Sequence, residues 1–177
     1  NLKIVILTGD LDTLQLVEGE KVVVRTFKKG ISDTFIYDED AVRERYGLRP
    51  DEMPDYKALV GDPSDNIKGI PGIGPKTAAL LIQKFGSLDG VYNNLDQEPK
   101  LKPKLQDFEE QAKFFKKLVI LERHISITIQ NLEELRVFDN SRELVKYFEK
   151  LGFQSLIKRL EGQVEPQGAK GPPETAH

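Results

Sequence analysis

Blocks of apolar residues, each followed by polar or turn-forming residues, divide the chain into short strands and helices. The aliphatic run 3–7 is typical of a buried strand in a parallel sheet, because such a strand contacts other layers on both faces. Two further strands are predicted at 21–25 and 34–37, joined by a Lys-Lys-Gly turn at 28–30.

Apolar residues at helical spacing predict the remaining elements. Asp, Ser or Pro marks the start of several segments, and glycine marks the end, as at Gly47 and Gly86. Residues 125–129 alternate weakly and are expected to form a short strand or an extended segment. The predicted helical segments are 13–17, 38–46, 51–60, 75–85, 87–94, a charged segment within 100–118, and 141–160, which Gly152 divides.

The buried first strand, with carboxylates just past its carboxyl end, predicts an α/β fold with a partial, mostly parallel sheet and a helical subdomain. We divide the chain into an α/β core at 1–66, a helical region at 67–161 and a disordered linker or tail at 162–177. The last segment is rich in Gly, Pro, Glu and Gln and poor in apolar residues. Both ends of the chain are expected to continue into a larger protein.

Composition narrows the class of protein. The 177 residues are 38% hydrophobic and 31% charged, which suits a globular protein with a modest core. No apolar run is long enough to span a bilayer, and the first residues do not form a signal peptide. The absence of cysteine excludes disulfides and thiolate metal sites, and an intracellular protein is the simplest fit. With a net charge of -3, any contact with nucleic acid must come from a local basic patch.

The segment Gly69–Ala78, Gly-Ile-Pro-Gly-Ile-Gly-Pro-Lys-Thr-Ala, has the pattern of the hairpin in a helix–hairpin–helix DNA-binding element. Its glycines permit left-handed backbone angles and close approach of another backbone, and Pro75 fixes the entry to the following helix. Amides at the start of that helix would face an anion, assisted by the helix dipole and the charge of Lys76. Such a hairpin binds the phosphate backbone and not base edges. The predicted DNA-binding residues are Gly69, Ile70, Pro71, Gly72, Ile73, Gly74, Lys76 and Thr77.

The structural alternative for this segment is a tight turn between two packed helices, with Ile70 and Ile73 as core anchors. Both interpretations can hold at once, because the apolar pair can pack inward while the amides face outward. The length of the pattern, with two prolines and a following lysine, favours DNA binding.

Four aspartates lie near this hairpin or after the first strand. Asp10 and Asp12 follow the strand at the end where open α/β sheets place active sites, and an extended backbone would point both side chains to one site. Asp62 and Asp65, in the turn Gly61–Asn66, would be adjacent if the turn enters a helix. Clustered carboxylates repel one another unless a cation neutralises them, and their hard oxygens suit Mg²⁺ or Mn²⁺. We therefore predict that all four aspartates bind metal and act in catalysis through it.

Each pair could instead be structural, because Asp commonly caps helices and forms Asx turns. Asp62 in particular could be a simple N-cap. The combination of a strand-end pair, an acidic turn and an adjacent phosphate-binding hairpin favours a metal-dependent nuclease, in which two ions roughly 4 Å apart activate a water and stabilise the leaving oxygen. The two histidines, His124 and His177, are assigned no role.

Lysines are frequent around and after the hairpin. A solvated helix face is the default interpretation of such a run, and a track for phosphates is the functional one. The sequence favours neither. The lysines concerned are Lys68, Lys76, Lys84, Lys100, Lys102, Lys104, Lys113, Lys116 and Lys117.

Three segments resemble the 5′-nuclease domain of bacterial DNA polymerase I, which belongs to the flap-endonuclease family. They are Leu-Thr-Gly-Asp-Leu-Asp-Thr-Leu-Gln-Leu at 7–16, Tyr-Gly-Leu-Arg-Pro at 46–50, and the continuous stretch 61–78. The resemblance runs from about residue 1 to the segment 152–156 and leaves out the tail. Its two core motifs, the acidic turn and the hairpin, are highly specific.

The resemblance implies a PIN-like nuclease core at 1–66 and a helix–hairpin–helix region at 67–161. It implies a structure-specific 5′-3′ exonuclease and 5′-flap endonuclease acting in DNA replication and repair in the bacterial cytoplasm, at the nucleoid. Two Mg²⁺ or Mn²⁺ ions are implied for the complete domain, with the four aspartates mainly at the second ion, and K⁺ at the hairpin carbonyls. The implied partners are DNA with a 5′ flap, nick or RNA primer and a polymerase domain in the same parent chain, with no membrane.

The sequence departs from the family pattern in one respect. The family's first strand with its metal-binding Asp, its helical arch with Lys and Arg, and its Glu-x-Asp-Asp motif do not occur here. We therefore expect the chain to be the C-terminal part of a nuclease domain and to be inactive alone. One rival is a non-catalytic helix–hairpin–helix DNA-binding module, which would need neither aspartate pair. A weaker rival is a DNA glycosylase, which shares the hairpin but would not need two Asp pairs.

Overall fold

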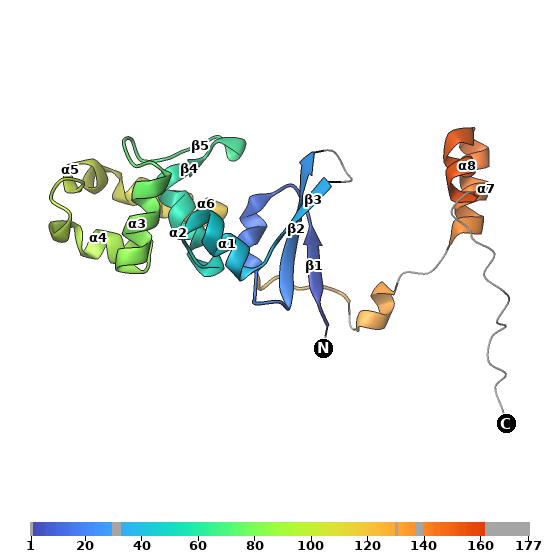
Figure 1. Ribbon diagram of the computed structural model, residues 1–177, viewed down its shortest axis with the longest axis horizontal. Helices are drawn as coiled ribbons and strands as arrows, with labels where there is room; N and C mark the ends of the chain where they lie inside the picture. The colour runs from blue at the N-terminus through green and yellow to red at the C-terminus, as the bar shows by residue number, and fades with distance from the viewer. Residues whose placement is uncertain (1, 30–32, 130, 137–139, 162–177) are drawn as a thin grey trace, which may run out of the picture. The chain divides into compact units, whose positions relative to one another are not determined.

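The computed structural model describes residues 2–29, 33–129, 131–136 and 140–161 (Figure 1). The chain divides into two compact units, 1–125 and 126–177. With 3₁₀ helices labelled η, the first unit contains β1 (Ile4–Leu7), η1 (Leu11–Leu16), β2 (Val22–Lys29), β3 (Asp33–Tyr37), α1 (Glu39–Tyr46), η2 (Pro50–Glu52), α2 (Met53–Val60), β4 (Gly61–Asp62), η3 (Pro63–Asp65), β5 (Ile67–Lys68), α3 (Pro75–Phe85), α4 (Leu88–Asn93), η4 (Leu95–Gln97), α5 (Lys102–Leu105), η5 (Gln106–Phe108) and α6 (Glu109–Val119). The second unit contains η6 (Leu132–Leu135), α7 (Ser141–Leu151) and α8 (Gln154–Glu161).

A three-stranded sheet opens the first unit. β1 runs parallel to β2, with Ile4 opposite Val22 and Leu7 opposite Arg25. β2 and β3 are antiparallel neighbours. The α/β class predicted from the sequence is thereby confirmed. The carboxyl end of β1 leads directly into the segment that carries Asp10 and Asp12.

Three details of the predicted sheet are wrong. The sheet is not mostly parallel, because β1 and β2 pair in parallel whereas β2 and β3 pair antiparallel. The aliphatic pattern of β1 predicts burial, but Ile4, Val5 and Leu7 are 48%, 47% and 60% exposed, because among the described strands only β2 pairs with β1. The turn predicted at 28–30 begins later, since β2 continues to Lys29; Gly30 lies outside the described residues.

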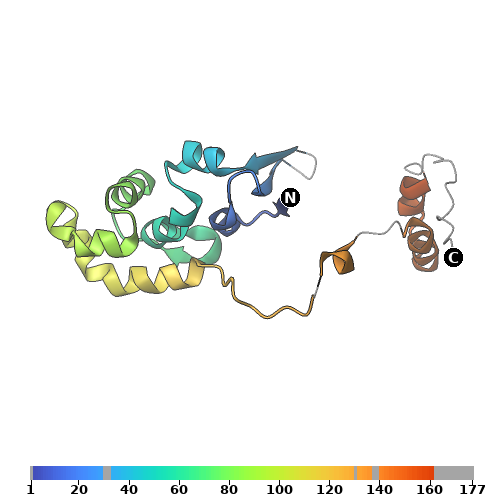
Figure 2. The ribbon, with the colours of Figure 1, turned by 90° about the horizontal axis from the view of Figure 1, so that it is seen from below.

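The core of the first unit is centred on α2. Its residues Met53, Ala58 and Leu59 are almost completely buried, and the helix packs against α3, α4 and α6. In Figures 1 and 2 the sheet lies at one end of this unit and α4 and α5 lie at the other. Leu14 and Ile82 belong to the same apolar core. The division predicted after residue 66 therefore falls inside one packed unit.

Local capping signals explain where the helices begin and end. Asp38 accepts a hydrogen bond from the Ala41 amide at 2.9 Å and caps α1, as predicted. Helix α3 begins at Pro75 and stops before Gly86, whose φ of 80° gives the left-handed conformation that glycine adopts without strain. The helices predicted at 51–60 and 100–118 are instead subdivided into α-helical and 3₁₀ segments.

The second unit contains a helical pair. Helices α7 and α8 pack against each other across Gly152, which has φ of 71° and ends α7 as predicted. The rings of Phe148 and Phe153 lie 6.1 Å apart. Residues 125–129 form neither helix nor strand, while the predicted tail at 162–177 lies outside the described residues. Among the described helices, none is long and apolar enough to cross a bilayer.

Candidate metal and DNA site

The turn between β4 and β5 carries two of the predicted aspartates. Gly61 pairs with Lys68 and Asp62 with Ile67, so the intervening residues form a closed loop. One carboxylate oxygen of Asp62, Oδ1, accepts a hydrogen bond from the Ser64 amide at 2.9 Å. The N-cap alternative for Asp62 is therefore correct, and this role leaves its second oxygen, Oδ2, directed to other partners.

Three of the four predicted aspartates come together. One carboxylate oxygen from each of Asp12, Asp62 and Asp65 lies within 4.8 Å of the other two. Asp10 is outside this group; its Oδ1 accepts a hydrogen bond from the Asp12 amide at 2.8 Å and caps η1. The extended backbone assumed for 10–12 is wrong, because η1 begins at Leu11 and turns Asp12 toward α2 and β4.

The spacing of these three carboxylates suits a hard divalent cation. Two oxygens on opposite sides of a Mg²⁺ ion are roughly 4 Å apart, so oxygens within 4.8 Å of one another need only a small closure to share an ion. Asp12 and Asp62 are largely buried, whereas Asp65 is exposed. The group therefore opens to solvent on the side of Asp65.

A lysine from α2 already places a positive charge in this group. The Lys57 ammonium donates hydrogen bonds to Oδ1 of Asp12 and, at 2.7 Å, to Oδ2 of Asp62. The three side chains are only 11–12% exposed. The Lys57 ammonium therefore bridges two carboxylates, that of Asp12, 45 residues away along the chain, and that of Asp62, 5 residues away.

Burial and this lysine act in opposite directions on the carboxylates. Burial raises the pKa of Asp12 above its usual range, although Lys57 partly offsets the effect. Burial also opposes ionisation of Asp62, but hydrogen bonds from Lys57 and Ser64 outweigh it and hold the pKa of Asp62 below its usual range. Burial disfavours the charge on Lys57, and its hydrogen bonds to the two carboxylates outweigh that cost and raise its pKa.

Gln15 holds the backbone of Asp12 in place. Its side-chain amide donates to the carbonyl of Asp12 at 2.9 Å and to that of Val119 at 2.8 Å. Its carbonyl oxygen accepts from the Leu121 amide at 3.0 Å. Gln15 is 5% exposed, so these bonds fix the acidic turn of η1 against the end of α6.

The predicted hairpin follows β5 directly. The Ile70 amide donates to the Leu59 carbonyl at 2.9 Å, and the buried side chains of Ile70 and Ile73 anchor the turn in the core. Gly72 has φ of 78°, and Gly74 precedes Pro75 at the start of α3. The two interpretations of this segment are therefore compatible in one structure: its apolar pair is a core anchor, and Gly72, Gly74 and Lys76 lie at the surface.

The structure separates the lysines of the basic stretch into two groups. Lys84, Lys102, Lys113 and Lys116 form ion pairs with carboxylates of the same unit. Lys104 instead lies against the hairpin, since a Cβ added to Gly72 would be 3.0 Å from its Nζ. Within the described residues neither Lys104 nor Lys76 is ion-paired, so both charges are available beside the hairpin.

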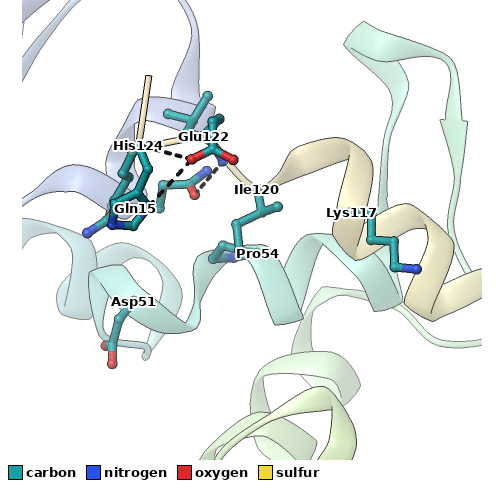
Figure 3. A pocket seen from close by; sticks show the side chains of 9 residues that line it. Gln15, Asp51, Pro54, Lys117, Ile120, Glu122 and His124 are labelled. Atoms are coloured by element: carbon teal, nitrogen blue, oxygen red, sulfur yellow. Dashed lines mark hydrogen bonds and ion pairs between the residues drawn. The ribbon is translucent and has the colours of Figure 1, made fainter. Parts of the chain in front are cut away.

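A separate open hollow of about 470 Å³ lies next to Gln15 (Figure 3). Figure 3 shows Gln15, Glu122 and His124 close together at one side of it and Lys117 at the other. The Glu122 carboxylate accepts from the His124 amide at 2.7 Å. None of the clustered aspartates lines this hollow, so it is distinct from the acidic group.

Sequence reasoning missed Lys57 and Gln15. The local signal for Lys57 is a single charged residue between Tyr56 and the buried pair Ala58 and Leu59. That pattern indicates a lysine near the apolar side of a helix, but it does not name the carboxylates that the lysine meets.

Solved 5′-nuclease structures share this fold. The T5 5′-exonuclease with bound zinc ions matches with a TM-score of 0.55 and 26% identity, over 66% of this chain and 42% of that chain. A bacteriophage T5 flap endonuclease in a complex with DNA and metal ions matches with a TM-score of 0.56 and 25% identity over the same shares. The chain thus shares part of the fold of these 5′-nucleases.

The sequence comparison gives the family itself. Residues 48–143 match the model described as 5′-3′ exonuclease, C-terminal SAM fold, and the chain belongs to this family. DNA polymerase I of Bacillus caldotenax is 40% identical over 159 residues, which cover 88% of this chain and 18% of that protein. The thermostable DNA polymerase I of Thermus thermophilus is 37% identical, with 95% of this chain and 20% of that protein covered. The chain therefore spans about a fifth of the length of these relatives.

Proposed function

We propose that this chain is part of a structure-specific 5′-3′ exonuclease and 5′-flap endonuclease of the DNA polymerase I type. It would act on DNA with a 5′ flap, a nick or an RNA primer, beside a polymerase domain in the same parent chain. Family membership and the DNA polymerase I relatives support the reaction class. One structural observation carries the proposal: the acidic group and the hairpin are joined by the two-residue strand β5, which leaves almost no chain between them.

The carboxylates of Asp12, Asp62 and Asp65 would hold the divalent ion, with Asp10 adjacent to them. Their oxygen-only donor set suits Mg²⁺ or Mn²⁺. When bound, such ions activate a water and stabilise the leaving oxygen of a phosphodiester. Asp62 is positioned for this role by its Ser64 cap, and Gln15 fixes the backbone of Asp12.

The hairpin would hold the duplex backbone beside the carboxylates. Exposed glycines allow close approach of a phosphate, the α3 N-terminus presents free amides, and Lys76 and Lys104 add positive charge. Carbonyl groups of the same hairpin are the proposed ligands for K⁺. This arrangement contacts phosphates only and supports recognition of duplex structure without base sequence.

A cleavage assay on a labelled 5′-flap duplex with Mg²⁺ or Mn²⁺ tests this proposal. The chain is compared with a version extended upstream to cover the nuclease region of its relatives. We expect cleavage by the extended protein, loss of cleavage in Asp62→Ala, and retention in Asp107→Ala, which removes an exposed carboxylate from η5. No cleavage by the extended protein, with duplex binding intact, would overturn the nuclease assignment.

The second candidate is a DNA-binding module without catalysis. The observation in its favour is that Lys57 pairs with both Asp12 and Asp62 and offsets part of their negative charge, so the acidic group depends less on a metal for its charge balance. This candidate predicts that Asp62→Asn changes neither metal binding nor any cleavage while duplex affinity stays the same. The nuclease proposal predicts that the same variant loses both metal binding and cleavage.

A further inference from the structure

Lys57 occupies the place that a cation would take between Asp12 and Asp62. Its ammonium nitrogen is 2.7 Å from Asp62 Oδ2 and is also hydrogen-bonded to Asp12 Oδ1. A divalent ion bound to those two oxygens would sit roughly 2 Å from each. The ammonium and the ion would therefore overlap, and their like charges would repel at any position close to both carboxylates.

The surroundings make this lysine a built-in part of the acidic group and not a surface side chain that happens to approach it. Lys57 lies on α2 between Tyr56 and Ala58, both buried, and its own side chain is 12% exposed. It begins five residues before Asp62 on the same continuous stretch of backbone. The α2 backbone is anchored by the core, so the ammonium can leave the carboxylates only by rotation of its own side chain.

We propose that Lys57 is an internal counter-ion that a divalent metal must displace, so that metal binding at this site is an exchange of an ammonium for a metal ion. This inference rests on the proposed function of the acidic group as a metal site, and it adds that Lys57 sets how tightly that site binds the metal ion. Without metal, Lys57 keeps two buried carboxylates compatible with the folded state. When a metal ion binds, the Lys57 ammonium moves away from the carboxylate oxygens that coordinate the ion. Because the ion pairs of Lys57 must be broken first, the affinity of the site for the ion is lowered.

Mn²⁺ titration of the full chain, followed by the electron paramagnetic resonance of free Mn²⁺, tests the exchange. Lys57→Met keeps the aliphatic stem and removes the charge, so it should bind Mn²⁺ about tenfold more tightly, or tighter still, because one repelling charge is gone. Lys57→Arg keeps the charge and should not show this gain. Lys113→Met is the matched control, since its ion pair with Glu109 on α6 involves none of the clustered aspartates. Unchanged or weaker Mn²⁺ binding by Lys57→Met would overturn the exchange.

Asp62→Asn separates this inference from the proposed function. If Asp62→Asn loses Mn²⁺ binding while Lys57→Met binds as wild type does, the metal site stands and the exchange is wrong. If Asp62→Asn binds Mn²⁺ as well as wild type, the metal site of the proposed function fails, and the exchange fails with it.

Two further readouts complement the titration, and the first needs only the wild-type protein. In wild type, the ¹⁵N resonance of the Lys57 ammonium should shift on addition of Mg²⁺, as its hydrogen bonds to Asp12 and Asp62 are lost. A resonance that stays unchanged at saturating Mg²⁺ would overturn the exchange. In EDTA, Lys57→Met should melt below wild type, and Mn²⁺ should raise its Tm by more than it raises that of wild type. An equal rise in both proteins would indicate a purely structural lysine.

Discussion

Gly61 and Gly69 cross with their backbones in direct contact. A Cβ added to Gly61 would lie 2.2 Å from the Gly69 amide nitrogen, and one added to Gly69 would lie 1.9 Å from the Val60 carbonyl oxygen. Gly61 also has φ of 83°, which side chains rarely tolerate. This crossing joins the acidic turn to the hairpin, so the two parts of the candidate site share one rigid junction.

Gly69→Ala is expected to lower the free energy of unfolding by about 3 kcal/mol, because the obstructing atoms are backbone and cannot rotate away. Urea unfolding followed by circular dichroism measures the change. Gly74→Ala is the control: an added Cβ there meets nothing within 4 Å, and its φ of -90° is ordinary. It should stay within about 0.5 kcal/mol of wild type. Equal stabilities of the two variants would show that the crossing can relax.

Lys104 is expected to contact phosphate together with the hairpin. Lys104→Ala should weaken binding to a duplex and lower the slope of log affinity against log salt by about 1, because one phosphate contact is removed. Fluorescence anisotropy at several salt concentrations measures both quantities. Lys113→Ala, which removes a lysine paired with Glu109 at 2.7 Å, should leave the slope unchanged. Identical slopes for Lys104→Ala and wild type would mean that Lys104 contacts no phosphate and belongs to a solvated helix face.

Gly74 is also the better glycine at which to test whether the hairpin binds DNA, because a substitution there does not disturb the fold. Gly72 has a left-handed φ of 78°, so a valine there would strain the fold itself, and a loss of DNA binding could then come from misfolding. Gly74→Val, in contrast, places its side chain in open space at the start of α3. We expect it to weaken duplex binding while the Tm is retained, and full affinity would contradict the role of the hairpin.

Features set by neighbouring residues could be predicted from the sequence. Asp38 caps α1, Pro75 begins α3 and Gly152 ends α7 because each acts within a few positions of itself. The hairpin is of the same kind, since its glycines and prolines define its backbone locally. Asp62, Asp65 and the hairpin also lie close together for a local reason, because all of them belong to one continuous stretch of 17 residues, from 61 to 77.

Features set by distant partners could not be predicted. The Lys57–Asp12 contact joins residues 45 apart, and the Gln15–Leu121 hydrogen bond joins residues 106 apart. Nothing in the local pattern of either residue names its partner. The exposure of β1 has the same origin, because an aliphatic strand is buried only where other elements cover it, and pairing with β2 alone leaves Leu7 exposed.

Gln15→Ala should lower the free energy of unfolding by about 2 to 4 kcal/mol. The reason is that the buried Val119 carbonyl and the partly buried Leu121 amide would lose their side-chain partner. Because Gln15 also holds the Asp12 carbonyl, the variant should weaken Mn²⁺ binding. Gln83→Ala removes an exposed glutamine with a single bond to the Gly47 carbonyl and should change stability by less than about 0.5 kcal/mol. Full stability of Gln15→Ala would mean that water replaces its bonds.

Tyr92 carries a buried hydroxyl that has no hydrogen-bond partner among the described residues. Tyr92→Phe removes this group and should raise the free energy of unfolding by about 1 kcal/mol. Tyr37→Phe should do the opposite, because the Tyr37 hydroxyl accepts a hydrogen bond from Arg45. Urea unfolding of both variants at neutral pH measures the contrast, and a destabilised Tyr92→Phe would mean that the hydroxyl is satisfied in solution.

The same tyrosine makes a prediction for alkaline pH. Burial raises the pKa of Tyr92 above its ordinary value of about 10. The folded state therefore holds its proton at pH values where the unfolded state releases it. Ionisation of Tyr92 therefore leaves the free energy of unfolding unchanged below pH 10 and lowers it as the pH rises further, by up to about 1.4 kcal/mol per pH unit. Tyr92→Phe lacks this loss, so its advantage over wild type should widen between pH 10 and 11; a constant difference would contradict the raised pKa.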